Sequence, residues 1–110
     1  MGLFVIGLNH KECPVGVRER IHFSSHLAEK ALALAKESPA LSEFMLLSTC
    51  NRVEFYGDAE EGSQAREAIL NLIESLHSVR RGEFENYLYL HETKDAVRHL
   101  FRVAAGLDSL

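Results

Sequence analysis

The residues best suited to chemistry are a cysteine and an arginine two positions apart, in the block Ser48-Thr49-Cys50-Asn51-Arg52. A thiolate is a strong nucleophile toward carbonyl carbon, and nearby positive charge favours the thiolate over the thiol. Arg52 could supply that charge, or could bind a substrate carboxylate through two parallel hydrogen bonds. The alternative is that Cys50 is a small buried residue with a structural role.

A second candidate is His99, which borders an apolar stripe on the last predicted helix. Asp95 precedes it by one helical turn, close enough to orient the imidazole or to favour its charged form. His99 is therefore a candidate general acid or base for Cys50. The competing interpretation is a solvent-facing histidine that pairs only with Asp95. Spacing does not separate the two, because the partners of a catalytic cysteine meet in space rather than in sequence.

Other chemistry-bearing residues give weaker signals. Glu54 follows Arg52 by two positions on a predicted strand, where the two side chains would share a face and could simply pair with each other. Cys13 precedes a proline, a dipeptide associated with haem-responsive regulation, but a proline that starts a short helix explains the pattern as well. The two cysteines and six scattered histidines lack zinc-ligand spacing, and no Gly-rich nucleotide loop is present. We expect no metal site.

The bulk composition is that of one ordinary globular domain. The chain has 110 residues, of which 46% are hydrophobic and 25% charged, so disorder is not expected. A formal net charge of −4 argues against a surface built throughout for nucleic acid, although a local patch could still contact the end of a tRNA. No apolar run approaches the length of a membrane span, and the apolar N-terminus has the pattern of a strand. We expect a cytoplasmic protein with both thiols reduced.

Hydrophobic patterning predicts strands on both sides of the Cys50 block. The apolar run 44–47 is typical of a buried strand, and so is the run 3–8. Alternation over 52–57 predicts a strand with one polar face. The side chains that would share this face are Arg52, Glu54 and Tyr56. Cys50 is therefore expected in a tight polar turn between two strands.

The helices are predicted from apolar residues repeated at helical spacing. Two longer amphipathic helices are expected near 27–35 and 65–76, and a shorter helix starts at Pro14. A short strand at 87–90 and a last helix from about 93 to 105 complete the order strand, helix, strand, strand, helix, strand, helix. This order predicts an α+β fold, an α/β sandwich with a ferredoxin-like split βαβ antiparallel sheet, helices on one face and an added C-terminal helix.

Several blocks of the sequence together resemble one family. These blocks are residues 7–11, Pro14 and Val15 with Arg18 and Glu19, residues 48–52 with Glu54 and Tyr56, and residues 96–109. Taken in order, they span the chain and resemble the N-terminal catalytic domain of bacterial glutamyl-tRNA reductase. The blocks at 48–52 and 106–109 are specific to that family. The resemblance implies NADPH-dependent reduction of the glutamyl group of glutamyl-tRNA to glutamate-1-semialdehyde, the first step of five-carbon tetrapyrrole (porphyrin and haem) biosynthesis.

The resemblance also implies roles for individual residues. Cys50 would attack the aminoacyl ester, giving an enzyme thioester and free tRNA, and hydride would then reduce the thioester to the aldehyde. Arg52 would bind the side-chain carboxylate of glutamate. This charge-assisted pairing would select glutamate over glutamine, because the neutral amide of glutamine cannot form it. His99 matches a histidine needed for activity, which would position the ester or polarise its carbonyl. Strand alternation adds Glu54, which we expect to orient Arg52. The other expected substrate contacts are Thr49, Asn51 and Ser109.

The family also implies parts that these residues do not contain. Residues 1–105 would form the catalytic domain, and residues 106–110 would begin the connection to an NADPH-binding domain and a dimerisation domain. The expected partners are glutamyl-tRNA, a second copy in a full-length homodimer and, through channelling, the next enzyme of the pathway; no membrane contact is expected. A rival hypothesis is a ferredoxin-like ligand-sensing or interaction module in which Cys50 is structural. An accessible, activated thiol would favour the enzyme, and a buried, inert thiol with an ordinary pKa would favour the module.

Overall fold

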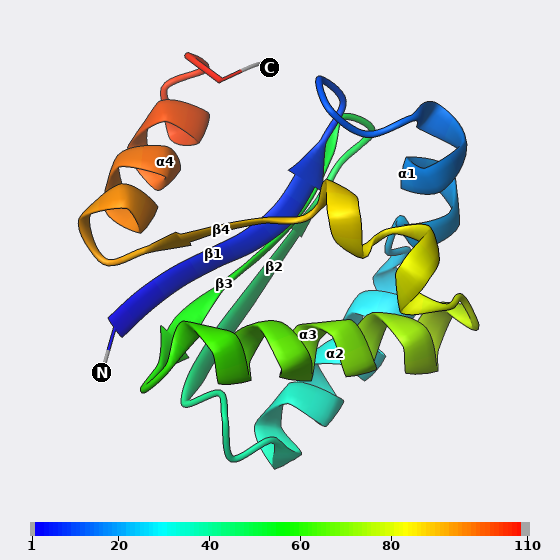
Figure 1. Cartoon of the computed structure of the whole chain (residues 1–110), viewed down its shortest axis with the longest axis horizontal. Coiled ribbons are helices and arrows are strands. Elements are labelled where there is room, and N and C mark those ends of the chain that lie inside the picture. Colours follow the sequence, from blue (N-terminus) through cyan, green and yellow to red (C-terminus); the bar gives the residue numbers. More distant parts are fainter. Residues whose placement is uncertain (1, 109–110) are drawn as a thin grey trace.

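The computed structural model describes residues 2–108 and confirms the predicted α+β fold (Figure 1). One sheet contains four strands in the order β2-β3-β1-β4, and each neighbouring pair is antiparallel. The strands are β1 (Gly2–Asn9), β2 (Glu43–Ser48), β3 (Arg52–Ala59) and β4 (Tyr89–Glu92). The central strands β3 and β1 pair with each other, the outer strand β2 pairs with β3, and the outer strand β4 pairs with β1. The split βαβ pattern predicts this arrangement.

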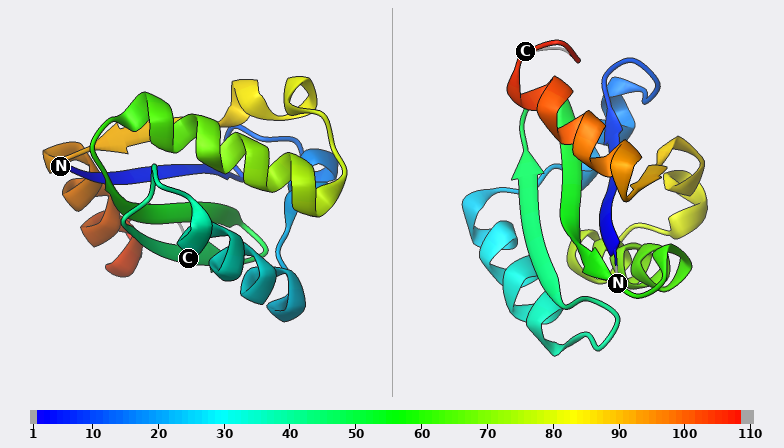
Figure 2. Two further views of the ribbon diagram at one scale, coloured as in Figure 1. Left: turned by 90° about the horizontal axis from the view of Figure 1, so that it is seen from below. Right: turned by 90° about the vertical axis from the view of Figure 1, so that its left-hand side faces the viewer.

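The helices lie on both faces of this sheet (Figure 2). Helices α2 and α3 cover one face, whereas α4 crosses the opposite face against β1 and β4. The helices are α1 (Val15–Ile21), α2 (Ser25–Glu37), α3 (Gly62–His77) and α4 (Lys94–Ala104). Ser24 caps the amino end of α2, where its hydroxyl accepts a hydrogen bond from the Leu27 amide at 3.2 Å. Within residues 2–108, none of the helices is long and apolar enough to cross a bilayer.

The alternation of β1 divides the apolar side chains between two cores. Phe4 and Ile6 belong to the large core that β1 and β3 form with α2 and α3. Val5 points to the other face, where it packs with Tyr56 of β3 and Ala96 of α4. Since successive residues of a strand face opposite sides, an apolar run with no polar position requires a layer on each face. The added helix α4 provides the second layer.

Two details of the predicted elements are wrong. The sequence pattern predicts a buried strand at 44–47, but β2 lies at the edge of the sheet and leaves Met45 half exposed, at 50%. An apolar run indicates a strand without showing whether a neighbouring strand covers it. The last strand begins at Tyr89 rather than at residue 87, because Glu85–Tyr87 forms a 3₁₀ turn that follows a similar turn at Arg81–Glu83.

Candidate functional site

The cysteine block forms the turn that joins β2 to β3. The Thr49 amide donates to the Arg52 carbonyl at 2.8 Å. The Thr49 hydroxyl accepts hydrogen bonds from the amides of Asn51 and Arg52, each at 3.2 Å. A threonine side chain thus satisfies the backbone of the turn, as is common for this residue type. Cys50 lies between these bonds with its side chain exposed, so the predicted tight polar turn is confirmed.

The turn is also held from outside, by α1 and by the segment that connects β1 to α1. Arg18 of α1 donates from Nη1 to the Cys50 carbonyl at 3.0 Å. The His10 amide donates to the Asn51 carbonyl at 2.8 Å. The turn, this segment and the carboxyl end of α4 gather at one end of the sheet (Figure 1). The exposed thiol therefore sits on a backbone that five hydrogen bonds fix, three within the turn and two from outside it.

Arg52 is buried beside this turn, with 4% of its side chain exposed, and two carboxylates neutralise it. Nη1 lies 3.3 Å from Oε2 of Glu54, whose side chain is fully buried. Nη2 lies 3.2 Å from Oδ2 of Asp108 and also donates to the Asp108 backbone carbonyl. Lys11 approaches the other oxygen of Asp108, with Nζ 3.6 Å from Oδ1. The guanidinium thus ties β3 to the segment that follows α4.

The pKa values of this cluster favour its charged state. Burial lowers the pKa of Arg52, but the negative charges of Glu54 and Asp108 outweigh burial, and the pKa lies above its usual value. Burial raises the pKa of Asp108, but the hydrogen bond and charge of Arg52 outweigh burial, and the pKa lies below its usual value. Both groups are therefore ionised at neutral pH, as a close and well-hydrogen-bonded ion pair requires.

Glu54 is the centre of a buried hydrogen-bond network. The Tyr56 hydroxyl donates to Oε1 at 2.8 Å, and Oε2 accepts from the Tyr89 hydroxyl and pairs with Nε2 of His99. Burial and the negative charge of Glu54 raise the pKa of both tyrosines, which keeps their hydroxyls as donors. The predicted alternation over 52–57 is confirmed, since Arg52, Glu54 and Tyr56 share one side of β3. That side of the strand faces α4 rather than solvent.

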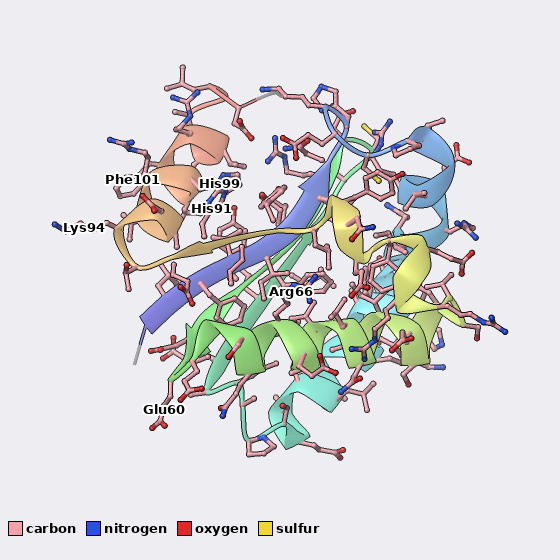
Figure 3. All side chains as sticks on the ribbon, in the orientation of Figure 1. Glu60, Arg66, His91, Lys94, His99 and Phe101 are labelled. Carbon is pink, nitrogen blue, oxygen red and sulfur yellow. The ribbon has the colours of Figure 1, made fainter. Side chains whose placement is uncertain are left out.

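His99 has a different partner from the one predicted. Figure 3 shows His99 on the side of α4 that faces the sheet, next to His91 of β4; the two ring centroids are 4.8 Å apart. Among residues 2–108, no hydrogen bond or ion pair joins His99 to Asp95, which is exposed, or to Cys50. The proposed pairing with Asp95 is therefore wrong, because the tertiary contact with Glu54 replaces the local one.

Two cavities meet at the cysteine turn. One, of about 430 Å³, lies on the α4 side and the other, of about 360 Å³, on the α1 side. Both are in the volume range of small-molecule sites. The residues that line both are Thr49, Cys50 and Arg52. A larger apolar cavity of about 690 Å³ lies between α2 and α3, away from the cysteine. The chemistry of Cys50 therefore belongs to the two smaller cavities.

The structure brings together only some of the predicted site residues. Thr49, Cys50 and Arg52 share the two cavities, and Glu54 contacts Arg52 from behind. His99 reaches the same cluster through Glu54 but lines neither cavity. The Asn51 backbone helps to hold the turn. Ser109 lies outside the described residues.

Sequence reasoning missed Asp108 and Tyr89, which contact the charged cluster directly. Asp108 lies in the family-specific block at 106–109, so that block could have indicated it. Tyr89 was part of a predicted strand, but no sequence signal points its hydroxyl at Glu54. Cys13 is buried at 4% exposure, and burial raises the pKa of its thiol, so haem iron would not reach it as a thiolate. Within residues 2–108, no group of three or more potential ligands could hold a metal ion.

Comparisons with known proteins agree on one family. The family described as the N-terminal domain of glutamyl-tRNA(Glu) reductase matches residues 6–110. The glutamyl-tRNA reductase of Thermodesulfovibrio yellowstonii is 44% identical over the whole of this chain, which covers 27% of that protein. The solved glutamyl-tRNA reductase of Methanopyrus kandleri is 33% identical over 98% of this chain and 23% of its own, with a TM-score of 0.69. The chain thus spans about a quarter of the length of these relatives.

Proposed function

The chain belongs to the family of N-terminal domains of glutamyl-tRNA reductase, and from this premise we propose that it carries out the acyl-transfer step of that enzyme. Cys50 takes the glutamyl group from glutamyl-tRNA as a thioester. The observation that supports this most directly is an exposed thiol on a fixed turn, beside a buried guanidinium and between two cavities. The rival interaction module would need a structural, buried Cys50.

The proposed reaction exchanges one bond for another. The Cys50 sulfur attacks the carbonyl carbon of the aminoacyl ester, and a carbon–sulfur bond forms as the bond to the ribose oxygen of the tRNA breaks. The proton of the thiol ends on that ribose oxygen, so the products are a glutamyl thioester and free tRNA. No redox change occurs in this step. A fixed turn assists it, because a nucleophile already held in place loses little further freedom on reaction.

Arg52 selects the glutamyl side chain in this proposal. A guanidinium binds a carboxylate through charge-assisted hydrogen bonds, and the neutral amide of glutamine cannot replace the charge. Asp108 holds Nη2 of Arg52 when no substrate is present. The carboxylate of the substrate would take the place of Asp108, so that one carboxylate replaces another on the same guanidinium. Thr49 and Asn51 form the turn below the reacting carbonyl, and we propose that Ser109 contacts the substrate as well.

His99 and Glu54 support Arg52. Glu54 accepts hydrogen bonds from three side chains and contacts Nη1 of Arg52, which leaves the guanidinium little freedom to rotate. We propose that His99 acts through Glu54 as a positioning residue. Its place behind the cluster supports this role better than proton transfer at the thiol.

The reducing step requires groups outside this chain. No Gly-rich nucleotide-binding loop occurs in the sequence, so the residues do not fit NADPH. We propose that another part of the full-length protein binds NADPH, which supplies the hydride that gives glutamate-1-semialdehyde for tetrapyrrole synthesis. A homodimer, channelling to the next enzyme and a cytoplasmic location remain part of the same proposal.

Acylation of the cysteine tests the proposed step. The chain is incubated with glutamyl-tRNA, quenched with acid and analysed by peptide mass spectrometry. We expect one glutamyl group on the peptide that contains Cys50. The adduct should be absent in Cys50→Ser and present in the matched variant Cys13→Ser. An unmodified wild-type chain, or an adduct that persists in Cys50→Ser, would overturn the proposal.

A further inference from the structure

Cys50 lies between two cavities, and these match the two parts of an ester substrate. An ester carbonyl joins an acyl group to an alcohol, so a nucleophile that attacks it needs space for each. Thr49, Cys50 and Arg52 line both cavities, whereas all other lining residues belong to one cavity alone. We propose that the cavity on the α1 side binds the 3′-terminal nucleotide of the tRNA, with Arg18 as its anchor. This inference rests on the proposed function and adds a binding site to it.

The lining of the α4-side cavity fits the acyl group. Apart from the shared residues, its lining is uncharged and without aromatic rings, and consists of Leu47, Val103, Ala104, Ala105 and Gly106. An aliphatic wall beside a guanidinium is complementary to a short carbon chain that ends in a carboxylate, as in a glutamyl group. Such a wall offers no charged or planar partner to a nucleotide phosphate or base. The alcohol part of the ester therefore belongs on the other side of the thiol.

The lining of the α1-side cavity fits a nucleotide. Apart from the shared residues, it consists of Val15, Arg18, Glu19, His22 and Val53. Proteins recognise the ends of RNA by stacking bases on aromatic rings or guanidinium planes and by contacts to phosphate and the 2′-hydroxyl. Arg18 and His22 provide a guanidinium and an imidazole, and the carboxylate of Glu19 can accept from a ribose hydroxyl or a base amine. Val15, 58% exposed, adds apolar surface.

Arg18 is the residue that connects this cavity to the nucleophile. Its Nη1 donates to the Cys50 carbonyl at 3.0 Å, so the guanidinium is already held next to the reacting turn. Its Nε is buried and, among residues 2–108, has no hydrogen-bond partner. Buried donors in folded proteins nearly always have a partner, so this one indicates a missing acceptor. A ribose or phosphate oxygen of the terminal nucleotide would supply it.

His22 is held in an orientation that suits a stacking role. Its Nδ1 lies 3.2 Å from the Ser48 hydroxyl, and its backbone carbonyl is contacted by Nε2 of His77 at 2.9 Å. These contacts use the edge of the imidazole and the backbone, and the residue as a whole is exposed. A ring fixed by its edge presents its face at small entropic cost. The terminal base would stack on that face.

The test compares two substrates that share an acyl group but differ in the alcohol side. Acylation of Cys50 is measured by mass spectrometry with glutamyl-tRNA and with the α-ethyl thioester of glutamate, which has no nucleotide. We expect Arg18→Ala to slow the reaction with glutamyl-tRNA at least about tenfold more than the reaction with the thioester, the loss expected when a charged anchor is truncated. Arg18→Lys, which keeps the charge but not the planar group, should show a smaller difference. Arg52→Ala should slow both reactions alike.

Arg20→Ala is the matched control, because Arg20 lies on the same helix and carries the same charge but pairs with Glu83 away from the cavity. In Arg20→Ala, the ratio of the acylation rate with glutamyl-tRNA to the rate with the thioester should equal that of the wild type. Equal losses with both substrates in Arg18→Ala would show that Arg18 only supports the turn, and would overturn this inference alone. A wild-type chain that neither substrate acylates would instead overturn the proposed function.

Discussion

The network around Glu54 makes a quantitative prediction for Glu54→Gln. The Glu54 side chain is fully buried, pairs with the buried Arg52 and accepts from Tyr56, Tyr89 and His99. Removing one partner of a buried ion pair costs about 3–5 kcal/mol when the other charge is left without compensation. In Glu54→Gln, Asp108 still pairs with Arg52 and glutamine keeps the volume and one acceptor oxygen, so we expect a loss at the low end, about 3 kcal/mol. That loss is a large part of the roughly 5–15 kcal/mol that stabilises a typical domain.

Urea unfolding followed by circular dichroism measures this loss. With a slope of about 2 kcal/mol per molar urea, which is usual for small domains, the midpoint should fall by about 1.5 M. Glu60→Gln is the matched control, because Glu60 is exposed at the end of β3 (Figure 3) and its midpoint should not move. A midpoint within about 0.3 M of the wild type would show that solvent reaches the pair and that the network does not hold Arg52.

Three further predictions concern the same region. A maleimide should label Cys50 in the folded protein and Cys13 only after unfolding, as peptide mass spectrometry can read, because one thiol is exposed and the other buried. Gly7→Ala should lower the free energy of unfolding by about 1–3 kcal/mol, since its Cβ would lie 2.5 Å from the Val53 carbonyl oxygen and 2.8 Å from Cγ of Glu54. Gly16→Ala, whose Cβ would meet nothing within 4 Å, should not be destabilised, and an equal loss in both variants would refute the steric argument. Because Arg52 outweighs burial and lowers the pKa of Asp108, the carboxylate stabilises the fold above its unfolded pKa of about 4 and this contribution disappears as pH falls through the lower folded pKa. The unfolding free energies of the wild type and Asp108→Asn should therefore differ at pH 7 and converge toward pH 3, and a constant gap in urea titrations would contradict this reasoning.

The sequence predicted the elements well because their signals are local. Alternation over 52–57 correctly grouped Arg52, Glu54 and Tyr56 on one side of a strand, and the mutual contacts confirm that grouping. Alternation did not reveal that this polar side faces another layer of protein. A charged position on a strand has the same period whether it faces water or a buried network. Only the path of α4 over the sheet decides between the two.

Errors arose where a distant contact replaced a local one. His99 was paired with Asp95, four residues away on the same helix, but its partner is Glu54, 45 residues away in the sequence. Similarly, Asp108 meets Arg52 across 56 residues, and no periodic pattern predicts such a contact. Local pairs on a helix surface contribute only a few tenths of a kcal/mol, about 0.2–0.5, so a buried partner readily outweighs them. The resemblance names candidate site residues, but it does not predict how they are connected.

The charges around Arg52 limit how a substrate carboxylate can bind there. Glu54 and Asp108 already place two carboxylates on one guanidinium; Lys11, which is largely exposed, pairs with Asp108, and the imidazole of His99 pairs with Glu54. A third carboxylate would add a further negative charge in a partly buried site, which is unfavourable. Glu54 is fully buried and holds three other side chains, so it cannot leave without breaking the network. Asp108 lies near the surface in the segment after α4, and only its departure leaves the cluster with the charge that it had before the substrate arrived.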